Sequence, residues 1–429
     1  MDLRLGRRSD PALVGLDIQP GFVAAVQARV NGSILAERAA ALPLAADTVR
    51  DGEVADEDAL SDVLRELFKD TGMSKRVRIG VANQRTVLRT LELPALSDEK
   101  ELAAAVRFQA QDQVPMPLNN AVLDFHPLGI VETPEGPRQR VVLVAAQRDM
   151  VERLLNAVRN AGLSPEGVDL SAFALIRSLY NPGSQEGERV LYLNVDGLTN
   201  LAIAEGRICR FTRVVGSGLE GMAGELAVRR GIALTEARAL LAGVDLGAAV
   251  RYAEAPAEAQ PEETRGEQPP AEEPPFAEAA SEEAALTEHP DEQASSPVEP
   301  LDPGEQEARE AAMSYEEMSS AAQAPVAPAA AASDLEVLEV LENGIRELSG
   351  EVRNSLDFHR SQDGGGDVSR VVLSGAAQDI PGFAEALQSS LGVEVQSQSV
   401  GLADERLAGT VSTHRLAIAT GLAALEAPQ

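Results

Sequence analysis

Four glycine-containing turns are the parts of this chain whose residue types could do chemistry. The turns lie at residues 17–21, 196–200, 216–218 and 374–378, each at or after the end of a predicted strand. Glycine-rich turns at strand ends expose backbone N–H groups that can bind the phosphate oxygens of a nucleotide. Carboxylates at the start of two of these turns could hold Mg²⁺ through water. The candidate nucleotide cleft consists of Asp17, Gly21, Asp196, Gly197, Thr199, Gly216, Gly218 and Gly375.

The other reactive side chains do not have the spacing of a catalytic or metal centre. The four histidines are far apart, and the chain has no Walker A, Gly-x-Ser-x-Gly or His-Glu-x-x-His motif. The single cysteine, Cys209, cannot form an internal disulfide, and its apolar neighbours predict a buried side chain rather than a reactive thiol. The sequence therefore identifies no catalytic residue and no metal site made of protein ligands.

The candidate turns belong to a pattern of three strands that occurs twice. The expected strands are 13–18, 22–30, 33–38, 190–195, 198–204 and 207–213. Asn31-Gly32 favours a tight hairpin in the first copy, because both residues accept positive φ. An aspartate, Asp17 or Asp196, lies at the end of the first strand in each copy. This predicts an internal duplication with two facing lobes; from the pattern alone, two unrelated meanders remain the alternative.

A smaller α/β unit is expected between the two copies. Ser97 can cap a helix that ends before Pro115, since proline disfavours a helical residue before it. The unit would be completed by strands at 123–127 and 141–146 and a helix at 150–161. Outside it, a strand is expected at 370–374 and helices at 56–72, 335–360, 381–391 and 416–425.

An acidic segment interrupts the second copy. Residues 251–333 are rich in Glu, Ala, Pro and Gln and show no apolar periodicity, so they are predicted to be a disordered insert. Between residues 254 and 334 there are 21 acidic residues and two arginines. A passive solvated linker and an acidic docking tether are both consistent with this composition.

Charge and hydropathy restrict the location and the partners. The net charge of −31 argues against binding to nucleic acid, which requires basic surface. No secretory signal is recognisable, and no window approaches eighteen consecutive apolar residues. We therefore expect a cytoplasmic protein that contacts a membrane only through a partner.

Taken together, these blocks resemble the actin-like ATPase superfamily and, within it, the PilM family of type IV pilus assembly proteins. The doubled strand pattern and the late segment 373–383 carry the general likeness, the latter resembling an adenosine loop followed by a Pro-Gly helix start. The likeness to PilM is carried by residues 101–117, 143–149, 161–163, 168–177, 211–213 and 351–358. The resemblance implies an α/β, two-lobed actin-like fold with duplicated meander and helix subdomains and a long acidic insert.

All three loops that hold the nucleotide in that superfamily are altered here. In the first loop Gln19 and Pro20 replace the Gly-Ser part, and proline has no N–H to donate. The second loop, which starts at Asp196, is about three residues shorter than the usual one. Ala376 and Ala377 stand in the adenosine loop where glycine is usual. ATP or ADP with magnesium is the cofactor that the resemblance implies, but these changes predict loss of hydrolysis.

The resemblance implies an adaptor in pilus biogenesis and twitching motility, peripheral to the inner membrane. Its expected partners are the cytoplasmic N-terminal peptide of a PilN-like membrane protein, pilus motor or platform proteins, and further copies of itself. The alternative is a working actin-like ATPase in cell division or filament formation. The expected division is a first lobe at 1–90 and 164–187, a small subdomain at 91–163, a second lobe at 188–250 and 334–429, and the insert at 251–333.

Overall fold

The computed structural model describes most of the chain outside the acidic segment. The described residues are 12–31, 33–96, 98–134, 136–183, 185, 187–247, 328–362, 364–409 and 411–424. Most of the predicted disordered insert, 251–327, lies outside them. The last residues of the predicted insert, up to 333, fall in helix α9, which begins at Pro328. Proline suits the first turn of a helix, and the alanines that follow are the best helix formers.

The first lobe is built on a six-stranded sheet in the order β10-β6-β1-β2-β3-β16. Strands β1, β2 and β3 form an antiparallel meander, and β6 and β10 continue the sheet beside β1 in parallel. The bounds are β1 Val14–Gln19, β2 Phe22–Asn31, β3 Ser33–Pro43, β6 Arg76–Val81, β10 Ser164–Leu170 and β16 Gly401–Leu402. A two-stranded ribbon, β4 Val49–Arg50 with β5 Glu53–Val54, follows the meander.

The second lobe repeats this topology in a five-stranded sheet, β13-β12-β11-β14-β15. Again the first three strands form an antiparallel meander, and two later strands run parallel beside the first of them. The bounds are β11 Arg189–Val195, β12 Thr199–Glu205, β13 Ile208–Val215, β14 Arg370–Ser374 and β15 Val395–Ser397. The predicted duplication is therefore confirmed, because two unrelated meanders would not share the flanking parallel strands.

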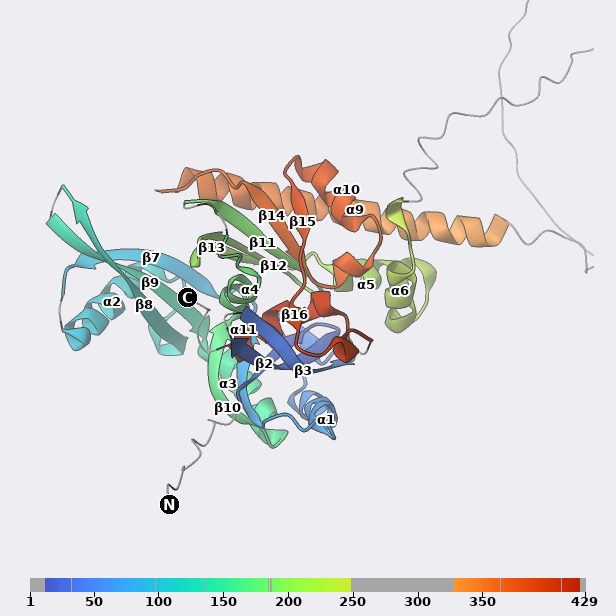
Figure 1. Cartoon of the computed structure of the whole chain (residues 1–429), viewed down its shortest axis with the longest axis horizontal. Coiled ribbons are helices and arrows are strands. Elements are labelled where there is room, and N and C mark those ends of the chain that lie inside the picture. Colours follow the sequence, from blue (N-terminus) through green and yellow to red (C-terminus); the bar gives the residue numbers. More distant parts are fainter. Residues whose placement is uncertain are drawn as a thin grey trace, which may run out of the picture. The chain divides into compact units, whose positions relative to one another are not determined.

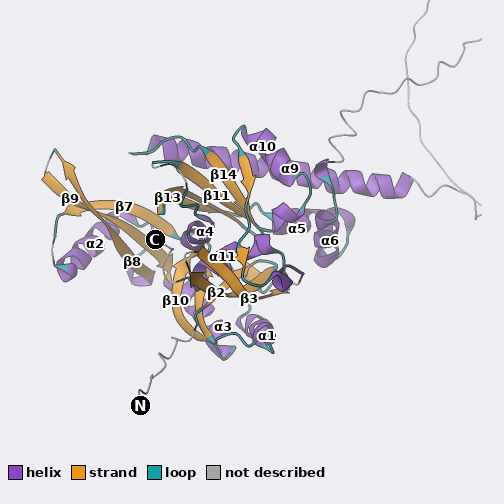
Figure 2. Cartoon of the chain, in the orientation of Figure 1, coloured by secondary structure: helices purple, strands orange, loops and turns teal. Residues whose placement is uncertain are grey.

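Helices and sheets alternate in layers because each meander strand buries alternate side chains on opposite faces. On the first sheet, Val14 and Leu16 pack against α1 and α3, whereas Ala24 and Val26 pack against α4 and α11. The second sheet covers the other side of α4 and α11, and its far face packs against α5, α6, α9 and α10. Figure 1 and Figure 2 show α4 and α11 between the two sheets. The helices are α1 Glu57–Phe68, α3 Arg148–Asn160, α4 Ser171–Leu179, α5 Leu219–Arg230, α6 Leu234–Ala242, α9 Pro328–Ser361, α10 Phe383–Leu391 and α11 Ala417–Ala423.

The small subdomain is a three-stranded antiparallel sheet with one helix on it. Its strands lie in the order β7-β9-β8, with β7 Val87–Pro94, β8 Ala121–Thr133 and β9 Gly136–Gln147. Helix α2 (Glu99–Gln113) packs on one face, and the short helix η1 (Leu118–Asn120) leads into β8. The N-cap of α2 is Asp98, whose side chain accepts hydrogen bonds from Lys100 N and Glu101 N. The predicted cap, residue 97, lies outside the described residues.

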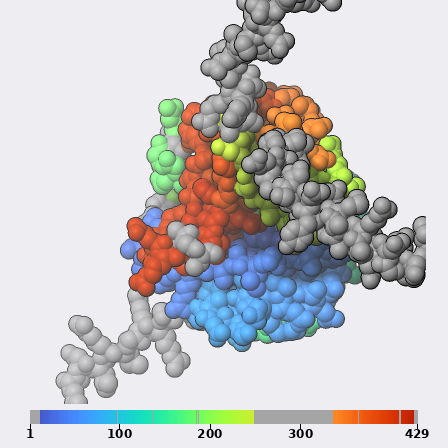
Figure 3. Space-filling model, turned by 90° about the vertical axis from the view of Figure 1, so that its right-hand side faces the viewer, coloured from blue at the N-terminus to red at the C-terminus, as the bar shows by residue number. Residues whose placement is uncertain are grey.

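The C-terminal segment returns to the first lobe. Strand β16 pairs with β3, and α11 crosses β1 so closely that a Cβ on Gly15 would lie 1.9 Å from the Ala419 carbonyl oxygen. In the space-filling view this segment (red) borders the strands of the first lobe (blue) (Figure 3). Residues 334–429 were expected to lie wholly in the second lobe, so this pairing departs from that expectation. Three short helices lie in the C-terminal part: η3 Ala376–Asp379, η4 Glu405–Gly409 and η5 Thr413–Leu416.

No helix in the described part of the chain is both long enough and apolar enough to cross a bilayer. The long helix α9 illustrates why, since charged residues alternate with its apolar residues along the sequence.

Candidate functional site

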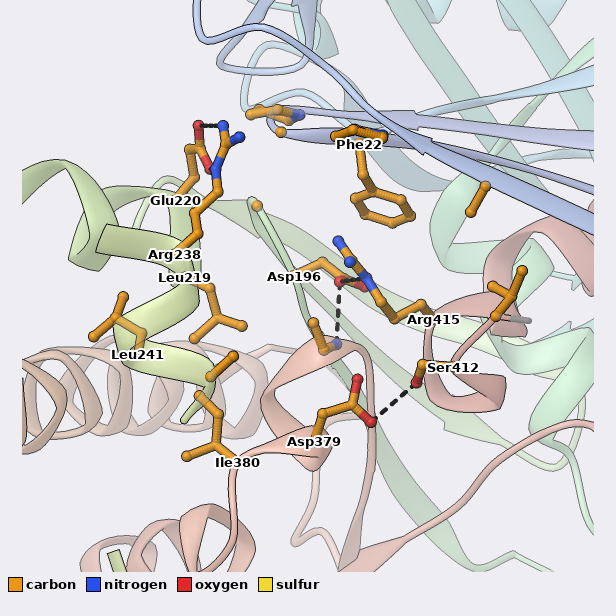
Figure 4. Close-up of a pocket in the computed structure, with 18 of the residues that line it drawn as sticks. Phe22, Asp196, Leu219, Glu220, Arg238, Leu241, Asp379, Ile380, Ser412 and Arg415 are labelled. Atoms are coloured by element: carbon orange, nitrogen blue, oxygen red, sulfur yellow. Dashed lines mark hydrogen bonds and ion pairs between the residues drawn. The ribbon is translucent and has the colours of Figure 1, made fainter. Parts of the chain in front are cut away.

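A cavity of about 420 Å³ lies where the turns of the two lobes meet. It is bounded by the β1–β2 turn and the end of β3 in the first lobe, and by the β11–β12 turn, α5, α6 and η3 in the second. Residues just before and within η5 complete its wall. The lining includes Gly21, Asp196 and Gly197 from the predicted site, which the fold brings together from distant parts of the sequence. Figure 4 shows this cavity.

Asp196 is the carboxylate at the centre of the site, and protein groups already satisfy it. Its side chain is 1% exposed and accepts hydrogen bonds from Asn194 Nδ2 at 3.2 Å and from Ala376 N at 3.1 Å. Arg415 Nε donates to Asp196 Oδ1 at 3.0 Å. Burial raises the pKa of Asp196, and the charge of Arg415 opposes that shift. The position predicted to hold a metal through water is thus occupied by a guanidinium group.

Asp17 is buried in the first lobe and does not belong to the described lining of the cavity. It is 2% exposed and accepts a hydrogen bond from Gln19 Nε2 at 3.0 Å. Burial, and next the negative charge of Asp196, raise the pKa of Asp17 to about 7. Gln19 Oε1 has no hydrogen-bond partner among the described residues.

The two turns that should cradle phosphates are in direct backbone contact. A Cβ on Gly197 would lie only 2.1 Å from the Pro20 carbonyl oxygen. At the start of α5, Leu219 N donates to Asp196 O at 2.8 Å, so a helix N-terminal donor is used within the protein. A Cβ on Gly218 would lie 2.5 Å from Gly197 O, which shows how tightly the turns pack. The two turns therefore pack directly against each other, and the cavity lies beside their contact.

The remaining predicted residues serve the packing of the turns and are not among the described lining residues. Thr199 Oγ1 donates to Ser217 O at 2.6 Å. Gly375 has φ +94°, and its N–H donates to His414 O at 2.9 Å. A Cβ on Gly216 would lie 3.1 Å from Gln84 Nε2. Glycine is required at 375 because a side chain there would be strained and would meet the backbone of β11.

A second ion pair, which was not predicted from the sequence, lies against the β1–β2 turn. Glu220 of α5 and Arg238 of α6 form a two-bond pair, one bond being Arg238 Nε to Glu220 Oε2 at 2.8 Å. Arg238 Nη1 also reaches Leu44 O in the first lobe at 3.5 Å. Gly21, at φ +86°, packs against this pair, since its Cβ would lie 2.7 Å from Glu220 Oε2. No local sequence motif marks these residues, because one lies in the first turn of α5 and the other on the next helix, α6.

The rest of the cavity has an apolar wall and one further carboxylate. Leu219, Leu241 and Ile380 face the space, and Asp379 accepts a hydrogen bond from Ser412 Oγ at 3.0 Å (Figure 4). The described lining carries three carboxylates and two guanidinium groups, so it is not basic. Such a space can hold an apolar group, but it lacks the excess positive charge that a polyphosphate needs.

These residues do not fit a nucleoside triphosphate with its metal. Pro20 has no N–H, the turns touch, and Arg415 occupies the partner position on Asp196. Among the described residues, no group of three or more His, Cys, Asp or Glu side chains could hold a metal ion. Cys209 is 7% exposed and burial raises its pKa to about 12, as expected for a buried hydrophobe.

Comparisons with solved structures show the fold of the chain. A structure described as "PilM-PilN type IV pilus biogenesis complex" is 20% identical with a TM-score of 0.66, over 97% of this chain and 99% of that chain. The ethanolamine utilization protein EutJ from Carboxydothermus hydrogenoformans is 14% identical with a TM-score of 0.47, over 97% of this chain and 90% of that chain. MreB5 of Spiroplasma citri bound to AMPPNP is 10% identical with a TM-score of 0.44, over 96% and 95%. The predicted two-lobed actin-like fold is confirmed.

A family model, "Type IV pilus assembly protein PilM", matches residues 15–238. This match spans the first sheet apart from β16, the small subdomain, and the meander of the second sheet with α5 and the first half of α6. It covers more than half of the chain, and it includes the segments on which the resemblance was based up to residue 213. The chain therefore belongs to the family of type IV pilus assembly protein PilM.

Proposed function

We propose that this protein is a cytoplasmic, non-hydrolysing adaptor of the type IV pilus assembly machinery. In this role it binds the cytoplasmic N-terminal peptide of a PilN-like inner-membrane protein and is held at the membrane by that partner. Membership of the PilM family supports the pilus role, and the solved PilM-PilN complex has the same fold. Pilus motor or platform proteins and self-association are further partners within this proposal.

The contact between Gly197 and Pro20 is the observation that carries the non-hydrolysing part. Phosphoryl transfer depends on positioning the phosphates and stabilising their charge. Here the turns that would do so touch each other, and the nearby carboxylate Asp196 is paired with Arg415. The alternative role, a working ATPase in cell division or filament formation, would need both features to be rearranged.

We place the peptide at the small subdomain, along the outer edge of β8. This strand is 13 residues long and, among the described strands, pairs with β9 alone, so one side of its backbone is available for strand addition. It also carries two exposed apolar side chains, Val122 at 36% and Ile130 at 61%. The opposite edge, β7, is shorter, with eight residues, and exposes no large apolar side chain among its described residues.

Replacing Val122 and Ile130 together by Asp should weaken binding of the PilN-like peptide by roughly tenfold or more. The change removes the apolar side chains that would contact the peptide and adds two negative charges to the edge of β8. Isothermal titration calorimetry of the full chain with the synthetic peptide, with and without Mg-ATP, measures the effect. Mg-ATP should give no binding heat and should leave the peptide affinity unchanged.

The matched control is Val228→Asp, because Val228 is 85% exposed on α5 in the second lobe. It should bind the peptide as the unmodified protein does. Equal weakening by both changes would rule out the β8 edge, whereas no binding of the peptide to the unmodified protein would refute the adaptor role. The domain division expected from the sequence is part of this proposal with two changes: the subdomain expected at 91–163 is placed at 87–147, because α3 packs on the first sheet, and the C-terminal segment contributes to both lobes.

A further inference from the structure

Arg415 is the residue that joins the two lobes at the cavity. Its guanidinium carbon lies 3.8 Å from the centroid of the Phe22 ring, which belongs to β2 of the first lobe. Its Nε donates to Asp196 at the end of β11 in the second lobe. Figure 4 shows Arg415 between these two partners. A single side chain thus makes a cation–π contact with one lobe and an ion pair with the other.

The charges around this side chain explain why a cation is required there. Asp17 and Asp196 are 2% and 1% exposed, and the negative charge of Asp196 acts on Asp17. Two buried carboxylates need a compensating charge, because burial without one is costly. In a nucleotide-binding cleft a bound metal could provide it, and here Arg415 does so from the chain itself.

Two further contacts, one on each side of Arg415, also hold the two lobes together. The Gly197 backbone packs on the Pro20 carbonyl group, and Arg238, paired with Glu220, reaches Leu44 O across the cleft. These contacts are made entirely by protein groups. Closure of the cleft is thus supported by contacts between protein groups.

We infer that Arg415 is a built-in counter-ion that holds the two lobes closed in place of a bound nucleotide and its metal. The arrangement of the lobes then does not depend on nucleotide, and the cleft is a rigid interface between them. This inference concerns the lobe interface and is independent of where the partner peptide binds.

Hydrogen–deuterium exchange of the full chain tests the inference, with peptides that cover residues 16–24 and 194–201. Arg415→Ala should raise amide exchange in both turns by roughly tenfold, because local opening becomes easier. Arg415→Lys keeps the charge but loses the planar group that stacks on Phe22, so its exchange should be intermediate. Millimolar Mg-ATP should not change exchange in the unmodified protein.

Arg406→Ala is the matched control, since Arg406 lies in the same C-terminal segment, is 92% exposed and pairs with Asp404. Its exchange should equal that of the unmodified protein. Phe22→Leu, which removes the ring and keeps the ion pair, serves if Arg415→Ala does not fold, and it should also raise exchange in both turns. Unchanged exchange in the Arg415 and Phe22 variants would overturn the inference. Slower exchange of the unmodified protein in Mg-ATP would overturn it as well, and the peptide titration would show separately whether the adaptor role stands.

Discussion

Replacing Asp17 by Asn should stabilise the protein at pH 7 and above by up to about 4 kcal/mol, and should remove part of its pH dependence. The pKa of Asp17 is raised from 3.8 to about 7 in the folded protein, chiefly by burial. Each unit of difference between the folded and unfolded pKa corresponds to about 1.4 kcal/mol. The amide keeps the shape of the side chain and avoids burying a charge.

The direction of the pH effect follows from proton binding. Between about pH 4 and pH 7 the unfolded chain has lost the Asp17 proton while the folded protein retains it. The stability contributed by this group is therefore greatest at low pH and is lost as pH rises through that window. Above about pH 7 both states are ionised and the slope from this residue disappears.

Urea unfolding of the unmodified protein and of Asp17→Asn at pH 5, 6, 7 and 8 measures the effect. The stability difference should grow from pH 5 to pH 7 and then level off. Asp112→Asn is the control, because Asp112 is exposed near the end of α2. If Asp17→Asn and Asp112→Asn gave parallel pH profiles, the burial argument would be refuted.

Replacing Gly421 by Ala should destabilise the protein by about 3 kcal/mol or more, the cost of overpacking a site that cannot relax. Gly421 lies in α11, and its new Cβ would be 1.9 Å from the carbonyl oxygen of Ala174 in α4. Both groups are backbone, so the contact can be relieved only if one helix moves. Helix α11 is fixed on its other side by β1, where a Cβ on Gly15 would lie just as close to Ala419 O.

The same substitution at Gly350 gives the control. Gly350 is inside helix α9, and its Cβ would meet nothing within 4 Å. Gly350→Ala should therefore stabilise the protein by roughly 0.5–1 kcal/mol, because alanine loses less backbone entropy in a helix. Chemical denaturation of the two variants measures both effects. Similar stabilities would show that α4 and α11 are not packed as tightly as described.

Much of the fold was predictable because local sequence patterns determine its strands and turns. The meander strands follow from alternating apolar residues, and the duplicated aspartates, Asp17 and Asp196, follow from the position of each at a strand end. Strands that end at the same edge of facing sheets bring their turns together, so Gly21 and Gly197 meet at the cavity.

The missed features depend on contacts between distant segments. Arg415 is 219 residues from Asp196, and no local pattern marks it as the partner of that carboxylate. Strand β16 has only two residues, too few for any periodicity, and its place beside β3 is a tertiary choice. The cap of α2 was missed for a different reason, since the serine and aspartate before the helix are adjacent and equally suited to the role.

The return of α11 to the first lobe has a consequence for folding during synthesis. Arg78 Nη1 donates to Ala424 O, a contact between residues 346 positions apart. The apolar face of the first sheet that α11 covers is therefore exposed on the ribosome until the chain has been made as far as α11. Closing so long a loop is slow and leaves partly folded chains prone to aggregate. A nascent chain of this protein should depend on chaperones until α11 emerges, long after the strands that α11 covers have been translated.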